Sequence, residues 1–214
     1  SRYWESCVSG PGRFIVFEGI DGSGKSTQIK RAMALLEAKG QDAVSTFEPS
    51  QGPVGVLIRQ MLEGRVETDQ RTIAALFAAD RTDHLLNPEN GARGLVDQGK
   101  ILLCDRYYFS SYAYHSLYME MDWVIGLNAQ NAQILRPDLN IFIDADPKNC
   151  FERIKSGRKS FDMYEKLEIM KQVRENYFSA FKKMESRENI VVVDGNGSPD
   201  RVENRIRRHI EDLL

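Results

Sequence analysis

Short, largely apolar runs alternate along the chain with longer segments whose apolar positions recur every three to four residues. An uninterrupted apolar run predicts a strand buried on both faces, whereas the three-to-four repeat predicts an amphipathic helix. The expected strands are residues 14–17, 43–47, 101–104, 139–143 and 190–193. The expected helices are residues 25–39, 54–63, 69–86, 112–135, 147–154, 164–184 and 199–213. This alternation predicts an α/β protein with a doubly wound, five-stranded parallel sheet flanked by helices.

Two segments fall outside this alternation. Residues 1–13 are expected to be an N-terminal extension of unknown role, followed by a single domain at 14–214. Within that domain, residues 153–159 (RIKSGRK) are basic and contain a glycine between two helical patterns. This stretch could be a mobile flap, but judged by its residues alone it is better explained as an ordinary solvated loop.

Composition narrows the function only slightly. The chain has 214 residues and a net charge of −2, so its bulk charge does not predict a nucleic-acid or membrane partner. No apolar run approaches the ~20 residues that span a bilayer. Three cysteines without a C-x-x-C pair argue against a disulfide framework or structural zinc, and they favour a reducing, cytoplasmic location. Cys104, inside the run ILLC, is expected to be a buried thiol.

The stretch FEGIDGSGKSTQ, residues 17–28, contains the pattern G-x-x-x-x-G-K-S between an expected strand and an expected helix. This is the context that a phosphate-binding loop requires. Its glycines let backbone N–H groups turn toward phosphate oxygens, and the helix N-terminus attracts the same anion. Lys25 can reach the β- and γ-phosphates, and Ser26 can offer its hydroxyl to Mg²⁺. The residues expected to bind ATP are Gly19, Ile20, Asp21, Gly22, Ser23, Gly24, Lys25, Ser26 and Thr27.

The loop alone leaves kinases, GTPases, motors and regulatory ATPases open. The sequence has no N-K-x-D motif for reading guanine, and its small size favours a kinase acting on a small molecule. Asp105 and Arg106 follow the third expected strand, and ligands of parallel sheets bind beyond the carboxyl ends of strands. The acid could hold Mg²⁺, and the arginine could bind a second phosphate through a forked contact. An isolated Asp-Arg pair is better explained as a salt bridge at a strand end.

Four segments taken together are more specific. The run DRYYFSSYAYH (105–115) is accompanied by FEPSQGPVG (47–55), ALFAADRTDH (75–84) and RPDLNIFIDADP (136–147). From Arg13 onward the chain resembles the thymidylate kinases, which phosphorylate dTMP with ATP. The resemblance implies the P-loop nucleoside-monophosphate kinase fold, Mg²⁺ as cofactor, ATP and dTMP as substrates, and a homodimer.

The resemblance also implies roles for individual residues. Arg106 would bind the dTMP phosphate, Asp105 would assist at the phosphate–magnesium site, and Asp21 would contact the sugar 3′-hydroxyl. Phe77 would stack on thymine and Arg81 would bond its carbonyl group. Without the resemblance, Phe77 is better explained as a core position of its helix, and Arg81 as a surface residue paired with Asp80 or Asp83. Asp21 also fits a polar turn residue that stabilises the loop.

The remaining implied contacts surround the sugar and base. Tyr114 would exclude ribonucleotides by crowding the 2′ position. The other residues expected to bind the acceptor are Ser110, Ser111, His115, Tyr164 and Glu165.

The resemblance makes residues 153–165 a LID that closes over ATP and excludes water. The expected catalytic groups are Lys25, Asp105, Arg106 and a LID arginine, with Arg158 preferred and Arg153 as its rival. Some thymidylate kinases carry an arginine where this chain has Gly22. We therefore expect an arginine at position 22 to rescue an Arg158→Ala enzyme in part.

Three residues depart from the family pattern. Phe47 stands where many bacterial relatives have arginine, His115 where many have glutamine, and Met163 where several have a LID arginine. These departures keep two alternatives open. One is another small P-loop kinase for a deoxynucleoside or a different monophosphate, and the other is a nucleotide-sensing module without turnover.

Overall fold

The computed structural model describes residues 12–155 and 160–214, without the side chains of residues 160–165. The strands are β1 (Arg13–Glu18), β2 (Ala43–Phe47), β3 (Ile101–Asp105), β4 (Leu139–Asp144) and β5 (Ile190–Asp194). The helices are α1 (Lys25–Ala38), α2 (Pro53–Leu62), α3 (Gln70–Leu86), α4 (Ala92–Asp97), α5 (Tyr108–His115), α6 (Met121–Leu127), α7 (Ala129–Ile134), α8 (Pro147–Ile154), α9 (Ser160–Met184) and α10 (Pro199–Glu211).

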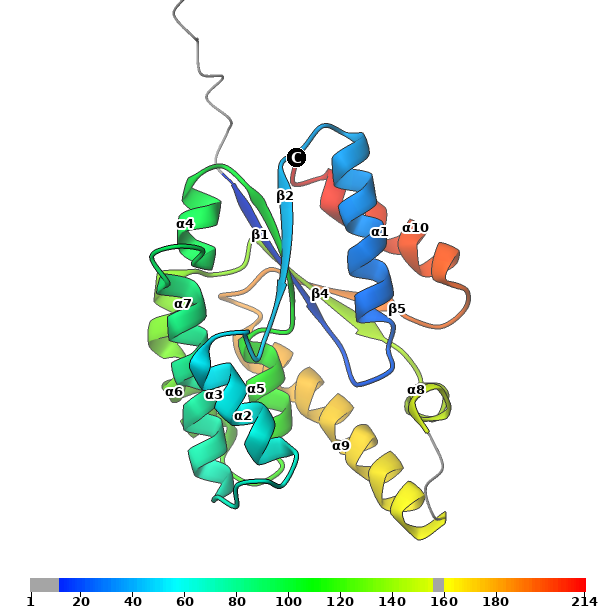
Figure 1. Cartoon of the computed structure of the whole chain (residues 1–214). Coiled ribbons are helices and arrows are strands. Elements are labelled where there is room, and N and C mark those ends of the chain that lie inside the picture. Colours follow the sequence, from blue (N-terminus) through cyan, green and yellow to red (C-terminus); the bar gives the residue numbers. More distant parts are fainter. Residues whose placement is uncertain (1–11, 156–159) are drawn as a thin grey trace, which may run out of the picture.

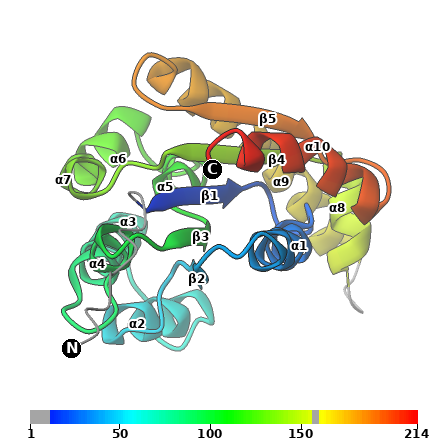
Figure 2. The same cartoon turned by 90° about the horizontal axis from the view of Figure 1, so that it is seen from above.

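The five strands form one sheet in the order β2-β3-β1-β4-β5, and every neighbouring pair is parallel. Figure 2 shows the strands in this order, with β1 in the centre. The predicted five-stranded parallel sheet is thus confirmed. Because all strands run the same way, their carboxyl ends share one edge of the sheet, where β1 leads into the phosphate loop and β3 ends at Asp105.

Successive residues of each strand face opposite sides, and both sides are covered by helices. Ile15 and Phe17 of β1 pack with the apolar stripes of α1 and α10. Phe14 and Val16 face the larger cluster that includes residues of α5, α8 and α9. Figure 1 shows α1 and α10 on one side of the sheet and α4 to α7 on the other. This two-sided burial explains why the central strands β1 and β3 read as uninterrupted apolar runs.

The predicted helix at 112–135 is wrong, because the chain there forms three short helices. The extended backbone of Glu120 separates α5 from α6, and Asn128 lies at the junction of α6 and α7. The buried Asn128 side chain accepts a hydrogen bond from Arg81 of α3, so its place is determined by a tertiary contact. Helix α4 was not predicted, since its six residues are too few for a clear apolar period.

Other local expectations are confirmed. Ser198 accepts a hydrogen bond from the N–H of Arg201 at the start of α10, and Pro199 occupies the first helical turn. Cys104 is fully buried and donates to the carbonyl oxygen of Arg106 at 3.1 Å. None of the helices in the described parts of the chain has the length and hydropathy to cross a bilayer.

Candidate active site

The phosphate loop lies between β1 and α1, at the carboxyl edge of the sheet. Gly19, Gly22 and Gly24 have φ angles of +154°, +79° and +97°, conformations that glycine adopts without steric cost. Gly24 is the N-cap residue that precedes α1, and no side chain caps the helix in the described structure. The N–H groups of the first turn are therefore available to an anion, which the helix dipole also attracts.

Lys25 points from the first turn of α1 back into the loop. It is only 7% exposed, and its Nζ donates to the carbonyl oxygens of Gly19 at 3.0 Å and Ile20 at 3.2 Å. Burial, assisted by the charge of Arg106, lowers the pKa of Lys25 to about 8, although nearby carboxylates act in the opposite direction. A polyanion beside Nζ would restore the ammonium form.

Gly22 has no room for a side chain. A Cβ at this position would lie 2.6 Å from the carbonyl oxygen of Cys150 and 3.0 Å from Cγ2 of Ile154, both in α8. Its φ of +79° disfavours any other residue as well. The expectation that arginine at position 22 would rescue an Arg158→Ala enzyme is therefore corrected, because α8 occupies the space that the side chain needs.

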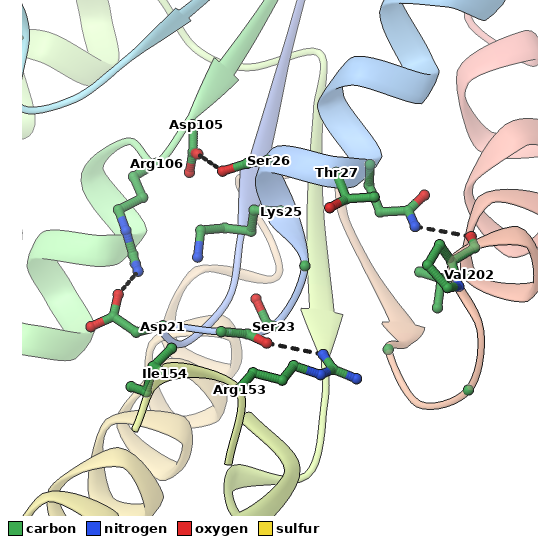
Figure 3. Close-up of a pocket in the computed structure, with 16 residues that line it drawn as sticks. Asp21, Ser23, Lys25, Ser26, Thr27, Asp105, Arg106, Arg153, Ile154 and Val202 are labelled. Atoms are coloured by element: carbon green, nitrogen blue, oxygen red, sulfur yellow. Dashed lines mark hydrogen bonds and ion pairs between the residues drawn. The ribbon is translucent and has the colours of Figure 1, made fainter. Parts of the chain in front are cut away.

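A cavity of about 590 Å³ opens over this loop. Figure 3 shows side chains from the loop, β3, α8 and α10 around it. Its lining residues are Asp21, Gly22, Ser23, Gly24, Lys25, Ser26, Thr27, Gln28, Asp105, Arg106, Arg153, Ile154, Gly195, Gly197, Pro199 and Val202. Seven of the nine residues expected to bind ATP line it, whereas Gly19 and Ile20 contribute the carbonyl groups that hold Lys25.

Ser26 and Asp105 meet at one wall of this cavity. The Ser26 hydroxyl lies 3.4 Å from Oδ2 of Asp105, while Oδ1 is buried without a hydrogen-bond partner in the described structure. A buried carboxylate oxygen without a donor is the kind of group that a hard cation satisfies. Across the described ranges, no set of three or more His, Cys, Asp or Glu side chains could hold a metal ion. The pair nevertheless fits Mg²⁺, which commonly takes one or two protein oxygens and completes its shell with phosphates and water.

Arg106 follows β3 with a left-handed backbone, φ +69°. Its Nη2 donates to Oδ1 of Asp21 at 2.6 Å and to the Tyr114 hydroxyl at 3.3 Å. The guanidinium carbon lies 5.0 Å from the centroid of the Tyr114 ring. The guanidinium therefore reaches back across the sheet edge to the phosphate loop, as the dashed contact to Asp21 in Figure 3 shows.

A second cavity, of about 390 Å³, lies on the other side of Arg106. Its lining includes the ring of Phe77 and several polar groups of α5, and it shares Asp21 and Arg106 with the first cavity. The acceptor residues predicted from the sequence that line it are Asp21, Phe77, Arg106, Ser110, Ser111, Tyr114 and His115. Tertiary folding thus brings residues from the loop, α3 and α5 to one site.

Arg81 lies behind this cavity and does not line it. The side chain is 1% exposed, and its guanidinium donates to Glu48 at 2.6 Å, Asn128 at 2.5 Å and the Ser111 hydroxyl at 3.1 Å. The alternative of a surface ion pair with Asp80 or Asp83 is wrong, because the partner is the buried Glu48. A direct bond from Arg81 to thymine stays a prediction, and Ser111 is the group through which Arg81 touches the cavity wall.

His115 and Phe77 form an edge-to-face pair in the same cavity, with ring centroids 5.0 Å apart. His115 is 6% exposed, and burial together with the charge of Arg81 lowers its pKa to about 4. The imidazole is therefore neutral near pH 7 and can donate through one nitrogen and accept through the other.

Phe47 ends β2 beside Asp105, its register partner, with 43% of its surface exposed. This strand end therefore adds no cation to the site.

Arg158 and Met163 lie outside the residues that can be described in full, as do the side chains of Tyr164 and Glu165. Arg153, the rival LID arginine, lines the first cavity and donates to the carbonyl oxygen of Gly22 at 2.9 Å.

Two residues behind Arg106 were not predicted from the sequence. Glu18 ends β1 and Tyr177 lies in α9; both are fully buried and belong to the hydrogen-bonded surroundings of Arg106. Glu18 could have been suspected, because a carboxylate directly after an apolar strand and before the loop requires donors when buried. Tyr177 carried no such signal, since it fits the apolar stripe of a long helix.

Comparison with known proteins agrees with this geometry. The family model described as "Thymidylate kinase" matches residues 17–206. The chain belongs to the thymidylate kinase family. A thymidylate kinase from Caldicellulosiruptor saccharolyticus is 34% identical over 213 residues, covering 95% of this chain and 98% of that protein. A thymidylate kinase from Desulfotalea psychrophila is 38% identical over 168 residues, 76% of this chain and 79% of that protein. The resemblance to thymidylate kinases is confirmed, and the sheet and phosphate loop are those expected of this family.

Proposed function

We propose that this protein transfers the γ-phosphoryl group of ATP to dTMP, giving dTDP and ADP. The observation that carries the proposal is the wall that the two cavities share. Asp21 and Arg106 line both the phosphate-loop cavity and the aromatic cavity, so two nucleotides could meet there with their phosphates adjacent. Membership of the thymidylate kinase family supports dTMP as the occupant of the aromatic cavity.

The acceptor would enter the cavity lined by Phe77, Tyr114 and His115. Phe77 offers a ring on which a pyrimidine can stack, and the neutral His115 can hydrogen-bond to the base edge. The Tyr114 hydroxyl lies 3.3 Å from Nη2 of Arg106, at the place where the sugar would join base and phosphate. This arrangement supports its role in excluding a 2′-hydroxyl.

Nη2 of the Arg106 guanidinium donates to Oδ1 of Asp21 at 2.6 Å. Its carboxylate stands where an acceptor phosphate would compete for the same guanidinium, and 56% of the Asp21 side chain is exposed. We therefore propose an exchange: the phosphate takes the place of Asp21 on Arg106, and the released carboxylate accepts from the sugar 3′-hydroxyl.

The donor triphosphate would lie along the phosphate loop, with Lys25 at its β- and γ-phosphates. Ser26 and Asp105 would hold Mg²⁺, which supplies charge neutralisation for the transferred group when it is bound. Arg153 already lies beside the loop, and Arg158 follows it by five residues. We propose that a LID arginine neutralises the charge that develops on the γ-phosphoryl group.

The transfer itself needs little covalent help from the protein. An oxygen of the dTMP phosphate attacks the γ-phosphorus in line, the bond to the β–γ bridging oxygen breaks, and ADP leaves with that electron pair. Because the attacking oxygen is already anionic near neutral pH, no general base is required. Holding two anions together and neutralising them therefore supplies most of the acceleration.

An acceptor panel tests this proposal. ATP with Mg²⁺ is offered dTMP, dUMP, dCMP, AMP or thymidine, and ADP release is followed together with product mass. We expect dTMP to give the highest kcat/KM. Phosphorylation of thymidine but not dTMP would identify a deoxynucleoside kinase, and tight binding of both nucleotides without product would identify a sensing module.

We also propose a homodimer and a cytoplasmic location. The family resemblance supports the dimer, and the buried free thiols of Cys104 and Cys150, both within the described residues, support a reducing compartment. Sedimentation velocity at several concentrations tests the dimer, which predicts a species of about twice the chain mass of 24.4 kDa. Fluorescence microscopy of a tagged chain in its own cells tests the location.

A further inference from the structure

Three side chains from three elements meet behind Arg106. Glu18 ends β1, Ser110 lies in α5 and Tyr177 lies in α9. Glu18 and Tyr177 are 0% exposed. We call the hydroxyl groups of Ser110 and Tyr177 the hydroxyl platform, because both lie between the Glu18 carboxylate and the Arg106 guanidinium.

Glu18 accepts four hydrogen bonds. Oε1 accepts from the backbone N–H groups of Tyr107 at 2.9 Å and Ser110 at 3.2 Å. Oε2 accepts from the hydroxyl groups of Ser110 at 2.6 Å and Tyr177 at 2.8 Å. Burial raises the pKa of Glu18, whereas these hydrogen bonds and the charge of Arg106 act in the opposite direction. Donors at both oxygens fit the ionised carboxylate, which can only accept.

These bonds determine where the hydroxyl protons point. A hydroxyl group has one proton and two lone pairs, so a hydroxyl that donates to Glu18 can only accept from its other neighbours. The two hydroxyl oxygens lie 2.9 Å apart, farther than either lies from Oε2, and the ionised carboxylate is the stronger acceptor. Both protons are therefore directed to Glu18, and both oxygens present lone pairs to Arg106.

Arg106 uses those lone pairs. Its Nη1 carries two N–H groups and lies within donor distance of three acceptors, Ser110 Oγ at 3.1 Å, the Tyr177 hydroxyl at 3.2 Å and the Gly19 carbonyl oxygen at 3.0 Å, so one N–H is shared between two of them. This nitrogen is held from behind, whereas Nη2 faces Asp21 across the wall shared by the cavities. With Nη1 held by the platform, Nη2 is the terminal nitrogen of the guanidinium that faces the shared wall, where a phosphate would bind.

We propose that Glu18 and Tyr177 are positioning residues for Arg106: the carboxylate takes the protons of the hydroxyl platform so that both hydroxyl oxygens accept from the guanidinium. The inference rests on the proposed function, in which Arg106 binds the acceptor phosphate. The inference also limits how Ser110 can contact dTMP. Because its hydroxyl proton is donated to Glu18, Ser110 can only accept a hydrogen bond from the nucleotide.

Helix α9 is anchored in a way that supports this role. One turn before Tyr177, Arg174 forms a forked ion pair with Asp144 of β4, with N–O distances of 2.7 and 2.9 Å. Asn176 donates to the carbonyl oxygen of Ala113 in α5 at 2.9 Å. The Tyr177 hydroxyl is therefore fixed relative to both the sheet and α5, between which Arg106 lies.

The molecule contains a matched control for this arrangement. Tyr108 is also 0% exposed and donates to a buried carboxylate, that of Glu188, at 2.6 Å. Neither member of this second pair lines either nucleotide cavity in the described structure. Tyr177→Phe and Tyr108→Phe thus make the same chemical change. Of the two, Tyr177→Phe removes a hydroxyl that accepts a hydrogen bond from Arg106.

The test compares KM for dTMP, KM for ATP, kcat and Tm in these two variants. For Tyr177→Phe we expect KM for dTMP to rise about tenfold, the effect of one lost hydrogen bond to a charged group, with KM for ATP within about twofold. For Tyr108→Phe we expect both constants to stay at their wild-type values, although Tm falls. If neither variant changes KM for dTMP, or both change it equally, Tyr177 is a core residue and the inference is wrong.

Three further variants separate the inference from the function on which it rests. In Glu18→Gln the amide nitrogen would face the platform as a donor, so KM for dTMP should again rise, and adding Tyr177→Phe should change it little further. If Arg106→Ala leaves KM for dTMP unchanged, the proposed acceptor role of Arg106 fails. If Arg106→Ala raises it while Tyr177→Phe does not, only the positioning inference fails.

Discussion

A guanidinium nitrogen of Arg153 donates to the main-chain carbonyl oxygen of Gly22 at 2.9 Å. The last turn of α8 is thereby joined to the phosphate loop from which α1 begins. The packing of α8 also explains why the loop has glycine at position 22, because this helix lies where a side chain would project. Helix α8, which precedes the proposed LID, is therefore joined directly to the loop that would hold the donor.

The first prediction concerns the LID arginines. Replacing the arginine that neutralises the transferred phosphoryl group should lower kcat by about 10³–10⁵, with a much smaller effect on dTMP binding. We expect this result for Arg158→Ala. For Arg153→Ala we expect mainly a rise in KM for ATP, because Arg153 holds the phosphate loop through Gly22. Single-turnover kinetics separate the two effects. If Arg153→Ala lowered kcat and Arg158→Ala did not, Arg153 would be the catalytic arginine.

The second prediction concerns Gly22. A non-glycine residue at positive φ costs about 1–2 kcal/mol, and each kcal/mol lowers Tm by about 2–4 °C in a chain of this size. Gly40 has φ +69° and open space where a Cβ would project, so Gly40→Ala should show this conformational cost alone. Gly22→Ala should lower Tm further, because its Cβ also meets the carbonyl oxygen of Cys150. Equal Tm values for Gly22→Ala and Gly40→Ala in thermal unfolding would show that a Cβ at position 22 does not clash with α8.

The third prediction follows from Lys25, whose pKa burial lowers to about 8. At pH 8.5 most Lys25 side chains are neutral in the free protein, and a bound triphosphate raises their pKa. ATP binding should therefore take up protons at pH 8.5, measured by calorimetry in buffers of different ionisation enthalpy. The variant Lys25→Arg stays charged and should bind ATP without this uptake. Equal proton uptake in both proteins would locate the titration elsewhere.

The fourth prediction concerns His115. Burial and the charge of Arg81 lower its pKa to about 4, so it should stay neutral from pH 6 to 8. His115→Gln keeps a neutral donor and acceptor and should change KM for dTMP by less than about threefold, whereas His115→Leu should raise it about tenfold, as expected for one lost hydrogen bond. The ratio of KM values between wild type and His115→Gln should be constant over this pH range. A ratio that changes near pH 6.5 would show that His115 titrates there.

Much of the site was predictable because its signals are local. The phosphate loop is readable because backbone conformation demands glycine at Gly19, Gly22 and Gly24, and Lys25 follows directly in sequence. Asp105 and Arg106 were readable because they follow an apolar strand, and the carboxyl ends of parallel strands share an edge. These inferences need only short-range geometry and one topological rule.

The sequence by itself therefore determined the sheet, the donor loop and the family to which the chain belongs. Only the tertiary structure decided that Arg81 pairs with buried Glu48, that α8 leaves no space beside Gly22, and that Glu18 and Tyr177 lie behind Arg106. The physical reason is the range of the contacts. A hydrogen bond between side chains 159 residues apart, as between Glu18 and Tyr177, depends on how β1 and α9 pack, and no local periodicity carries that information.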